Sequence, residues 1–434
     1  MIKKVFKNII VSILTWEARL VVKKYNPKII AITGSVGKTS TKDAIFTVLS
    51  KFKTVRKSEK SFNSEIGLPL TILGCPNGWS NPVTWIENIL IGFSIIVFKH
   101  SYPEYLILEV GVGKPGDIKK NVAPWLRPDI VVITRFPDKP VHVEYFKNTE
   151  DIIEEKSALA YSLKKNGLLI LNHDDEKVYA VHAKANKRTV SYGTNENATY
   201  KATHASYINT KINDDEVTRG ISFKLVHDGN TFPIILPHIV GMHYIDSVLA
   251  ALACAIELGC DLLESIKYIS EYNTPPGRLS LIEGMNSSMI IDDTYNSSPV
   301  AATAALEVLK EMKSKRKIAV LGDMLELGKF TEEEHHILGE KVAKIADMLI
   351  LVGPRAKFIK EGALENGFNL KELYSFDSSI TAGRFMEGVI EKGDLVLVKG
   401  SQGVRLERIV AAIMAHKELK SRLLCRQEHE WQNR

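Results

Sequence analysis

A glycine-rich turn between an apolar run and a run of hydroxyl residues constrains this chain more than any other feature. Residues 33–41 read Thr-Gly-Ser-Val-Gly-Lys-Thr-Ser-Thr and directly follow the apolar residues 29–32. This order predicts a short buried strand, a tight turn and the start of a helix. The backbone N–H groups of such a turn, together with the positive end of the helix dipole, bind phosphate groups. The sequence therefore predicts an α/β fold with a phosphate-binding P-loop.

The side chains of this P-loop have roles that follow from their chemistry. Lys38 can reach the terminal phosphates of a nucleotide, and the Thr39 hydroxyl can ligate Mg²⁺. Only two residues separate Gly34 from Gly37, so this is a shortened form of the general motif. The alternative interpretation is a strand–turn–helix corner that contains Gly-Lys-Thr by chance. The residues predicted to bind the nucleotide here are Gly34, Ser35, Gly37, Lys38, Thr39 and Ser40.

The overall composition indicates an ordinary globular chain. Its 434 residues are enough for two or three domains with separate cores. The net charge of +6 suits an anionic substrate such as a nucleotide, but it is too weak to indicate nucleic-acid binding, so no nucleic-acid partner is expected. The four cysteines have no metal-binding spacing, and we expect free thiols in a reducing cytoplasm. We also expect a monomer.

The region from residue 28 to about residue 171 alternates strand and helix patterns. Strands are predicted at 28–33, 52–56, 104–110, 129–134 and 167–171, and helices at 38–50, 64–73, 116–123 and 149–165. This alternation predicts a mostly parallel sheet with helices on both faces. Residues 186–236 instead have short β-like runs between Asn and Asp turns, which predict a β-rich flap on the same domain.

A break at Pro275, Pro276 and Gly277 separates this region from a second alternation of strands and helices. The second set of strands is predicted at 288–293, 317–321, 347–352, 372–376 and 394–398. This pattern predicts a second, doubly wound Rossmann-like domain. The predicted division of the chain is an N-terminal basic amphipathic helix at 1–27, a central P-loop domain at 28–273 and a C-terminal Rossmann-like domain at 274–434.

Two segments are apolar enough to raise the question of membrane contact. In residues 2–24, six basic residues accompany an apolar helix face, which is typical of a helix on an anionic membrane surface and also of a helix packed on its own domain. Residues 85–99 are more apolar, but Glu87 and Gly92 interrupt them, so a buried or interfacial helix is predicted rather than a membrane span. No small-residue cleavage site follows the first segment, so no signal peptide is expected.

Outside the P-loop, three residues are candidates for the same site. Glu109 closes an apolar strand, and a carboxylate at the carboxyl end of a parallel strand can bind a hard cation; the alternative is a solvated strand-end glutamate. His142 follows the strand at 129–134 and can ligate a second Mg²⁺, although a single loop histidine is more often structural. Lys156 lies in an acidic helix and by itself is typical of a surface lysine in salt bridges. In the second predicted domain, Asp293 ends a strand, and Arg278 follows the break and is placed to contact a phosphate.

The chain resembles the Mur ligase family over roughly residues 29–412. The shortened P-loop is itself the family's form. The Tyr-Asn pair at 295–296 and the Gly-Asp-Met-x-Glu-Leu-Gly run at 322–328 are similar to the branch that adds a dipeptide. The matching motifs, in order, are 33–41, 62–69, 108–111, 115–118, 142–146, 156, 241–243, 276–279, 292–296, 322–328 and 399–401.

The resemblance implies roles that the residues alone do not. Lys38, Lys156 and His142 are implied to be catalytic, and Lys156 is expected to be carbamoylated, which turns a cation into a carboxylate-like oxygen ligand. Two Mg²⁺ ions are implied, with Thr39, Glu109, His142 and Lys156 as their ligands. His243, Arg278 and Asp293 are implied to contact the nucleotide.

The resemblance also implies a reaction and its partners. An ATP-dependent ligase of this kind adds D-alanyl-D-alanine to a muramyl tripeptide through an acyl phosphate, and releases ADP and phosphate, in peptidoglycan precursor synthesis. The family's dipeptide-adding members have a uridine-nucleotide-binding domain ahead of the P-loop, whereas about 28 residues precede it here. The expectation is that a UDP group is held differently or that the substrate is lipid-linked. A lipid-linked substrate fits a cytoplasmic protein that contacts the membrane through residues 2–24.

Two alternative functions remain open on the sequence. One is an amide ligase on the same scaffold that uses a lipid-linked or other non-UDP carboxylate, of the folylpolyglutamate or poly-γ-glutamate type. The other is a P-loop binding protein that has lost ligase activity.

Overall fold

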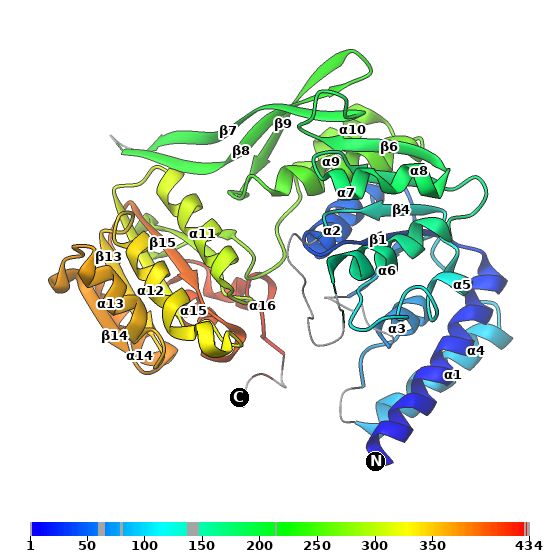
Figure 1. Ribbon diagram of the computed structural model, residues 1–434, viewed down its shortest axis with the longest axis horizontal. Helices are drawn as coiled ribbons and strands as arrows, with labels where there is room; N and C mark the ends of the chain where they lie inside the picture. Colours follow the sequence, from blue (N-terminus) through cyan, green and yellow to red (C-terminus); the bar gives the residue numbers. More distant parts are fainter. Residues whose placement is uncertain are drawn as a thin grey trace. The chain divides into compact units, whose positions relative to one another are not determined.

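The computed structural model describes residues 2–59, 66–78, 81–136, 146, 148–212, 215–428 and 431, with backbone only for 2–8, 212 and 215. Its α/β architecture forms two compact units, each described separately below (Figure 1). The first unit comprises residues 1–204, 223–234 and 243–272, and the second comprises 205–222, 235–242 and 273–434. The predicted fold class is confirmed. The domain division proposed from the sequence stays a prediction.

The first unit is built on a parallel sheet whose central strand leads into the P-loop. The strands are β1 (Lys28–Thr33), β2 (Val55–Lys57), β3 (Tyr105–Glu109), β4 (Ile130–Ile133), β5 (Leu168–Asn172) and β6 (Arg188–Gly193). They are ordered β2-β3-β1-β4-β5-β6, with every neighbouring pair parallel. Because β1 lies between β3 and β4, its carboxyl end is flanked by Glu109 on one side and Thr134 on the other.

Helices cover both faces of this sheet. Ile29 and Ala31 of β1 face one core, which they share with α1 (Ile2–Tyr25), α3 (Gly67–Leu73) and α6 (Thr149–Tyr161). The helices that pack together on the strands from the other side include α2 (Lys38–Leu49), α9 (Tyr244–Glu257) and α10 (Leu262–Ile269). The short helices α5 (Ala123–Leu126), α7 (Glu176–Tyr179) and α8 (Val181–Ala185) complete the unit.

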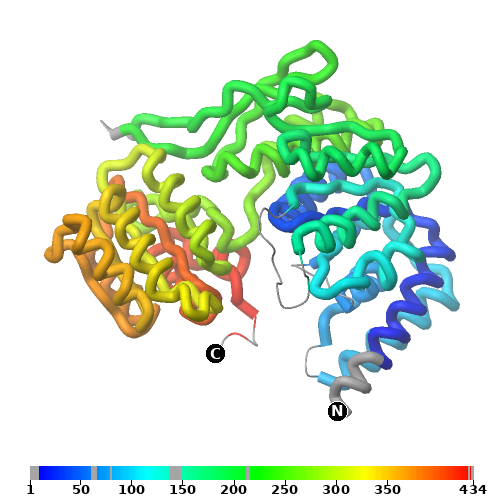
Figure 2. The backbone as a smooth tube through the Cα atoms, viewed as in Figure 1, coloured from blue at the N-terminus to red at the C-terminus, as the bar shows by residue number. Residues whose placement is uncertain are grey.

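Two longer helices at the edge of this unit lie side by side, α1 and α4 (Pro82–Val97) (Figures 1 and 2). The apolar residues Ile10, Leu14, Ala18 and Val21 of α1 are buried in the core of the unit. The side chains of residues 10–21 on this face therefore pack on their own domain, as one of the two interpretations of residues 2–24 predicted, and membrane contact through the segment stays a prediction. Among the helices that the structure describes, none combines the length and unbroken apolar character that a bilayer crossing requires.

The predicted flap is a run of long strands. β7 (Tyr200–Ile212), β8 (Asp215–His227) and β9 (Asn230–Pro237) continue the sheet order after β6. The β-rich character predicted for residues 186–236 is confirmed. The predicted helix at 116–123 is wrong, because these residues form turns ahead of α5. The Glu155 carboxylate accepts hydrogen bonds from the backbone N–H groups of Gly116, Ile118 and Lys119, which fixes this segment as a loop.

The second unit has its own sheet, ordered β10-β11-β15-β12-β13-β14. Its strands are β10 (Ser280–Glu283), β11 (Met289–Asp293), β12 (Arg316–Gly322), β13 (Met348–Val352), β14 (Leu373–Phe376) and β15 (Asp394–Lys399). Only β10 runs antiparallel to its neighbour, and the other pairs are parallel. Its main helices are α11 (Pro299–Glu311), α12 (Thr331–Val342), α13 (Lys357–Glu365), α14 (Ser379–Val389) and α15 (Glu407–Ile413). The sequence predicted this doubly wound unit, although α13 was not predicted.

Candidate active site

The backbone conformation of the P-loop requires glycine at two positions, Gly34 and Gly37. Gly34 has φ +142°, and a Cβ placed there would lie 2.0 Å from Thr134 Oγ1. Gly37, at φ +81°, is the residue from which α2 starts. The end of β4 anchors the loop, because Thr134 Oγ1 donates a 2.6 Å hydrogen bond to the carbonyl of Val36. The backbone is therefore packed against a strand end with no room for a larger side chain.

Two lysines converge on one carbonyl of this loop. Lys38 Nζ donates a 2.9 Å hydrogen bond to the carbonyl of Gly34, and Lys156 Nζ donates a 2.8 Å hydrogen bond to the same oxygen. Lys156 also donates to Ser35 Oγ at 2.8 Å and is only 3% exposed. Burial, and to a smaller extent the charge of Lys38, lowers the pKa of Lys156 to about 7. The site thus concentrates positive charge where phosphate oxygens approach a P-loop.

Glu109 lies on the other side of the loop, at the end of β3. The Thr39 hydroxyl donates a 3.0 Å hydrogen bond to Glu109 Oε2, and both residues are buried. The backbone N–H of Glu109 donates to Ser58 Oγ at 3.2 Å, which fixes the strand end. The sequence predicted Thr39 and Glu109 as ligands at two Mg²⁺ positions, and the structure brings the two side chains into contact with each other.

Lys42 is a further charged residue here that the sequence reasoning missed. Its side chain is 1% exposed, and its Nζ lies 3.8 Å from Glu109 Oε2 and 3.8 Å from Asp43 Oδ1. One signal was available, because Lys42 follows Lys38 by four residues and so shares a helix face with it. Lys42 and Glu109 are both buried. The positive charge of Lys42 therefore interacts more strongly with the Glu109 carboxylate than it would in water.

The remaining nucleotide-binding predictions in this unit fall on α2 and α9. Ser40 is buried, and its carbonyl accepts a 3.1 Å hydrogen bond from the hydroxyl of Tyr272. His243 is exposed at the start of α9, with its ring 4.4 Å from that of Tyr244. Ser247 Oγ accepts a 3.2 Å hydrogen bond from Thr41 Oγ1, so this residue joins α9 to α2.

Arg278 and Asp293 belong to the second unit, where they lie in one local cluster. Asp293 Oδ2 accepts a 2.6 Å hydrogen bond from the buried Lys399, and its Oδ1 accepts one of 3.2 Å from the backbone N–H of Leu279. The Arg278 guanidinium lies 4.3 Å from the centre of the Tyr295 ring. Asp293 therefore positions the backbone beside Arg278. His142, which the sequence placed at the metal site, lies outside the described residues.

The donor set of the first unit suits a hard divalent cation. Mg²⁺ in proteins is bound by one or two carboxylate or hydroxyl oxygens, with phosphate oxygens and water completing the shell. Thr39 and Glu109 supply such oxygens within 3.0 Å of each other. Among the described residues, no group of three or more His, Cys, Asp or Glu side chains forms a metal site.

Comparison with known proteins identifies two matching family models. The Mur ligase middle domain matches residues 32–255, and the Mur ligase glutamate ligase domain matches residues 277–402. A UDP-N-acetylmuramoyl-tripeptide–D-alanyl-D-alanine ligase of Bacillus subtilis is 31% identical over 396 residues, which cover 91% of this chain and 77% of the relative.

Solved structures have a similar fold. MurF ligase from Thermotoga maritima, solved in complex with ADP, is 25% identical and superposes with a TM-score of 0.69, covering 95% of this chain and 84% of that one. MurF from Acinetobacter baumannii is 24% identical, with a TM-score of 0.76 over 95% of this chain and 81% of that one.

Proposed function

The chain belongs to the Mur ligase family, and from that premise we propose that it joins D-alanyl-D-alanine to a muramyl tripeptide. The reaction consumes ATP and produces ADP and phosphate. The product is a peptidoglycan precursor. The relatives that carry this activity in their names match about nine-tenths of the chain.

One observation supports this proposal more than any other. Lys38 and Lys156 donate hydrogen bonds to the same carbonyl of the P-loop, so two lysine side chains lie where the glycine turn and the start of α2 also favour an anion. A nucleoside triphosphate satisfies this site, because its phosphate oxygens can accept hydrogen bonds from Lys38 and from the loop backbone.

Lys156 is suited to carbamoylation. An amine must be neutral to react with carbon dioxide, and the lowered pKa of about 7 leaves a large neutral fraction of Lys156 at physiological pH. The amine nitrogen attacks the carbon of CO₂ and loses a proton, which gives an anionic carbamate. We propose that this carbamate serves, with Thr39, Glu109 and His142, to bind two Mg²⁺ ions. When bound, these ions neutralise the charge that develops on the transferring phosphoryl group.

In this reaction the protein acts more by positioning the substrates than by taking part in covalent chemistry. The terminal carboxylate of the tripeptide attacks the γ-phosphorus, the bond to the β-phosphate oxygen breaks, and an acyl phosphate and ADP form. The amino group of D-alanyl-D-alanine then attacks the acyl carbon, and phosphate leaves as the amide forms and the amine loses a proton. Lys38 holds the γ-phosphate in line, while the backbone of residues 34–39 fixes the β-phosphate.

In the second unit, we propose Arg278 and Asp293 as nucleotide contacts. Tyr295 stacks under the Arg278 guanidinium, and Lys399 pairs with Asp293, so both side chains are held in defined positions. A guanidinium held in this way can bind a phosphate group. A carboxylate at the end of a strand can accept a hydrogen bond from a ribose hydroxyl or from a base N–H group. The proposed domain division, with boundaries at residues 27 and 273, assigns nucleotide binding to 28–273 and these contacts to 274–434.

Identification of the product tests the proposed function. The protein is incubated with ATP, Mg²⁺ and D-alanyl-D-alanine, and with either a UDP-linked or a lipid-linked muramyl tripeptide. Mass spectrometry should find one acceptor extended by the dipeptide minus one water. A Lys38→Met variant, matched by Lys53→Met at an exposed lysine, shows whether the product depends on the P-loop. Extension by glutamate instead, or no product from any acceptor, would contradict the proposal.

A further inference from the structure

Helix α4 presents a continuous apolar stripe to solvent. The residues on this stripe follow one another at spacings of three and four, so they share one face of the helix. Each is between 52% and 62% exposed. We call this set the α4 stripe: Val83, Ile86, Leu90, Phe93 and Val97.

The opposite side of α4 already makes the contacts that hold it on the fold. Trp85, Asn88, Gly92 and Ile95 are buried. At the last turn, Lys24 Nζ of α1 donates hydrogen bonds of 2.9 and 3.0 Å to the carbonyls of Ile95 and Ile96. The α4 stripe is therefore not needed to attach the helix to its own core, and its exposure calls for another explanation.

Apolar exposure in the described part of the chain is concentrated here. Of the 18 large apolar side chains exposed there, nine belong to α1, α4 and the residue that caps α4, Phe98. Scattered exposure of single apolar residues is normal, whereas a contiguous patch marks an interaction surface. Ile9 and Trp16 are exposed on α1, which lies beside α4 (Figures 1 and 2).

The same helices are strongly basic. The sequence of α1 has six basic residues and one acidic residue, Glu17. Arg19 and Lys23 are exposed, and Lys99 is exposed just beyond α4. Glu17 is 2% exposed, and burial raises its pKa to about 7, so near neutral pH it is only partly ionised. An apolar stripe on a helix that has exposed cations beyond its carboxyl end and on its neighbour α1 is complementary to a lipid bilayer with an apolar interior and an anionic surface.

We propose that the α4 stripe, with α1 beside it, docks on an anionic lipid bilayer. The helix lies in the plane of the interface, with Val83, Ile86, Leu90, Phe93 and Val97 among the acyl chains and the exposed Arg19, Lys23 and Lys99 at the headgroups. From residue 83 to residue 97 the stripe extends about 21 Å along the helix at the usual rise per residue. Its spacing also suits contact with another helix, but a second copy of this chain would bring two basic surfaces together.

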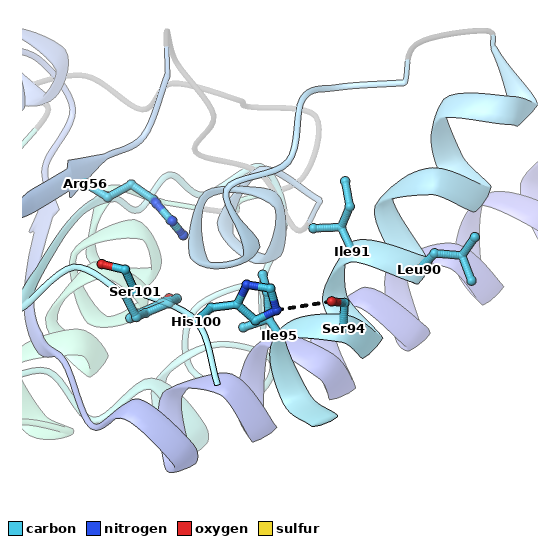
Figure 3. A pocket seen from close by; sticks show the side chains of 8 residues that line it. Arg56, Leu90, Ile91, Ser94, Ile95, His100 and Ser101 are labelled. Carbon is cyan, nitrogen blue, oxygen red and sulfur yellow. Dashed lines mark hydrogen bonds between the residues drawn. The ribbon is translucent and has the colours of Figure 1, made fainter. Parts of the chain in front are cut away.

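A hollow next to α4 has the same mixed chemistry. Its volume is about 440 Å³, and its lining combines apolar Leu90 and Ile91 with the polar or charged Arg56, Ser94 and His100 (Figure 3). In Figure 3, His100 hydrogen-bonds Ser94 across the helix end at 3.1 Å. An amphiphile with an acyl chain and an anionic head fits this lining, so the hollow supports the same occupant as the stripe.

Vesicle sedimentation tests the proposal on the whole chain. The wild type should co-sediment with vesicles of phosphatidylglycerol and phosphatidylcholine, and bind at least tenfold more weakly to phosphatidylcholine alone. The double variant Leu90→Glu, Phe93→Glu should lose at least tenfold in affinity for the anionic vesicles. Leu263→Glu, at a residue of α10 that is 64% exposed, is the matched control and should bind as the wild type. All three proteins should release ADP equally fast with a water-soluble acceptor.

A second measurement does not depend on the fold of the charged variant. A Phe93→Trp variant should give a blue-shifted emission with anionic vesicles, and brominated acyl chains should quench it more than they quench the wild type. Equal binding to both vesicle types, no added quenching of the introduced indole, or wild-type binding by the double variant would overturn the proposal. The proposal would also be overturned if the wild type formed a dimer without lipid and the double variant were monomeric. The stripe would then be assigned to contact with a second copy of the chain.

Discussion

The Thr39 hydroxyl donates a 3.0 Å hydrogen bond to Glu109 Oε2 across 70 residues of sequence. The parallel pairing of β1 with β3 produces this contact, because Ile32 pairs with Glu109 and both strands end at the same edge of the sheet. The oxygens for a cation site are therefore assembled by backbone pairing. Side chains fixed in this way need little rearrangement when a nucleotide and Mg²⁺ bind.

Replacement of Glu109 by Gln should remove activity while leaving the fold intact. The amide keeps the shape of the side chain and can still accept from Thr39, but it is a much weaker ligand for Mg²⁺. We expect kcat to fall about a hundredfold or more, which corresponds to about 3 kcal/mol of transition-state stabilisation. Steady-state assays at increasing Mg²⁺ concentration measure this loss. Glu104→Gln, at an exposed residue just before the same strand, should leave kcat unchanged.

The buried Lys156 predicts an unusual dependence of stability on pH. In the unfolded chain this amine titrates near 10.5, whereas in the folded chain its pKa is about 7. Between these values the unfolded chain binds more protons, so this residue makes the folded state more stable as the pH rises from about 7 to 10.5. Denaturant unfolding in carbonate-free buffer should therefore find Lys156→Met more stable than the wild type near pH 7.

The two proteins should approach each other in stability near pH 10. The exposed-site variant Lys165→Met should follow the wild type throughout. Lys156→Met should also have almost no turnover, and added bicarbonate should not restore it, because the variant has no amine to carbamoylate. Full activity in Lys156→Met would remove this residue from the proposed metal site.

Substitution of Gly34 by Ala should damage the P-loop. The new Cβ would lie 2.0 Å from Thr134 Oγ1, and φ +142° is strained for any L side chain. A loss of about 2–4 kcal/mol of unfolding free energy is expected from strain and displacement together. Calorimetry with ADP should show at least a tenfold loss of affinity. Gly229→Ala is the control that separates backbone strain from steric collision. Gly229 also has a positive φ, but no atom lies within 4 Å of a Cβ placed there. This substitution should lower the unfolding free energy by only about 1 kcal/mol.

Substitutions of Lys399 and Asp293, which form an ion pair, should have strongly coupled effects on the unfolding free energy. Lys399 is 2% exposed and its Nζ lies 2.6 Å from Asp293 Oδ2. Asp293→Asn leaves a buried ammonium without its counter-charge and should cost about 3–5 kcal/mol of unfolding free energy. The double variant Asp293→Asn, Lys399→Met should recover part of that loss. Purely additive effects in this double-mutant cycle would show that the pair is not coupled.

Local pattern was sufficient to predict the P-loop. Its glycines, its lysine and the apolar strand before them determine both the turn and the chemistry within nine residues. Glu109 was predictable for a related reason, since a carboxylate that closes an apolar strand must lie at the sheet edge. His142 stays a prediction, because it lies outside the described residues.

Lys156 and α4 show where local pattern fails. The acidic neighbours of Lys156 indicate a surface helix, but Glu155 turns inward to bind three backbone N–H groups, and Lys156 is buried beside it. Only the packed structure decides which face of α6 is inside. In α4 both faces are apolar, so the sequence could not say which one the core would use and which one would stay exposed.

ADP release with defined substrates tests the central claim most directly. We predict that more than one turnover of ADP appears only when ATP, a muramyl tripeptide and D-alanyl-D-alanine are all present, with one amide formed for each ADP. Sustained ADP release when either peptide is omitted, or none when all are supplied, would contradict it.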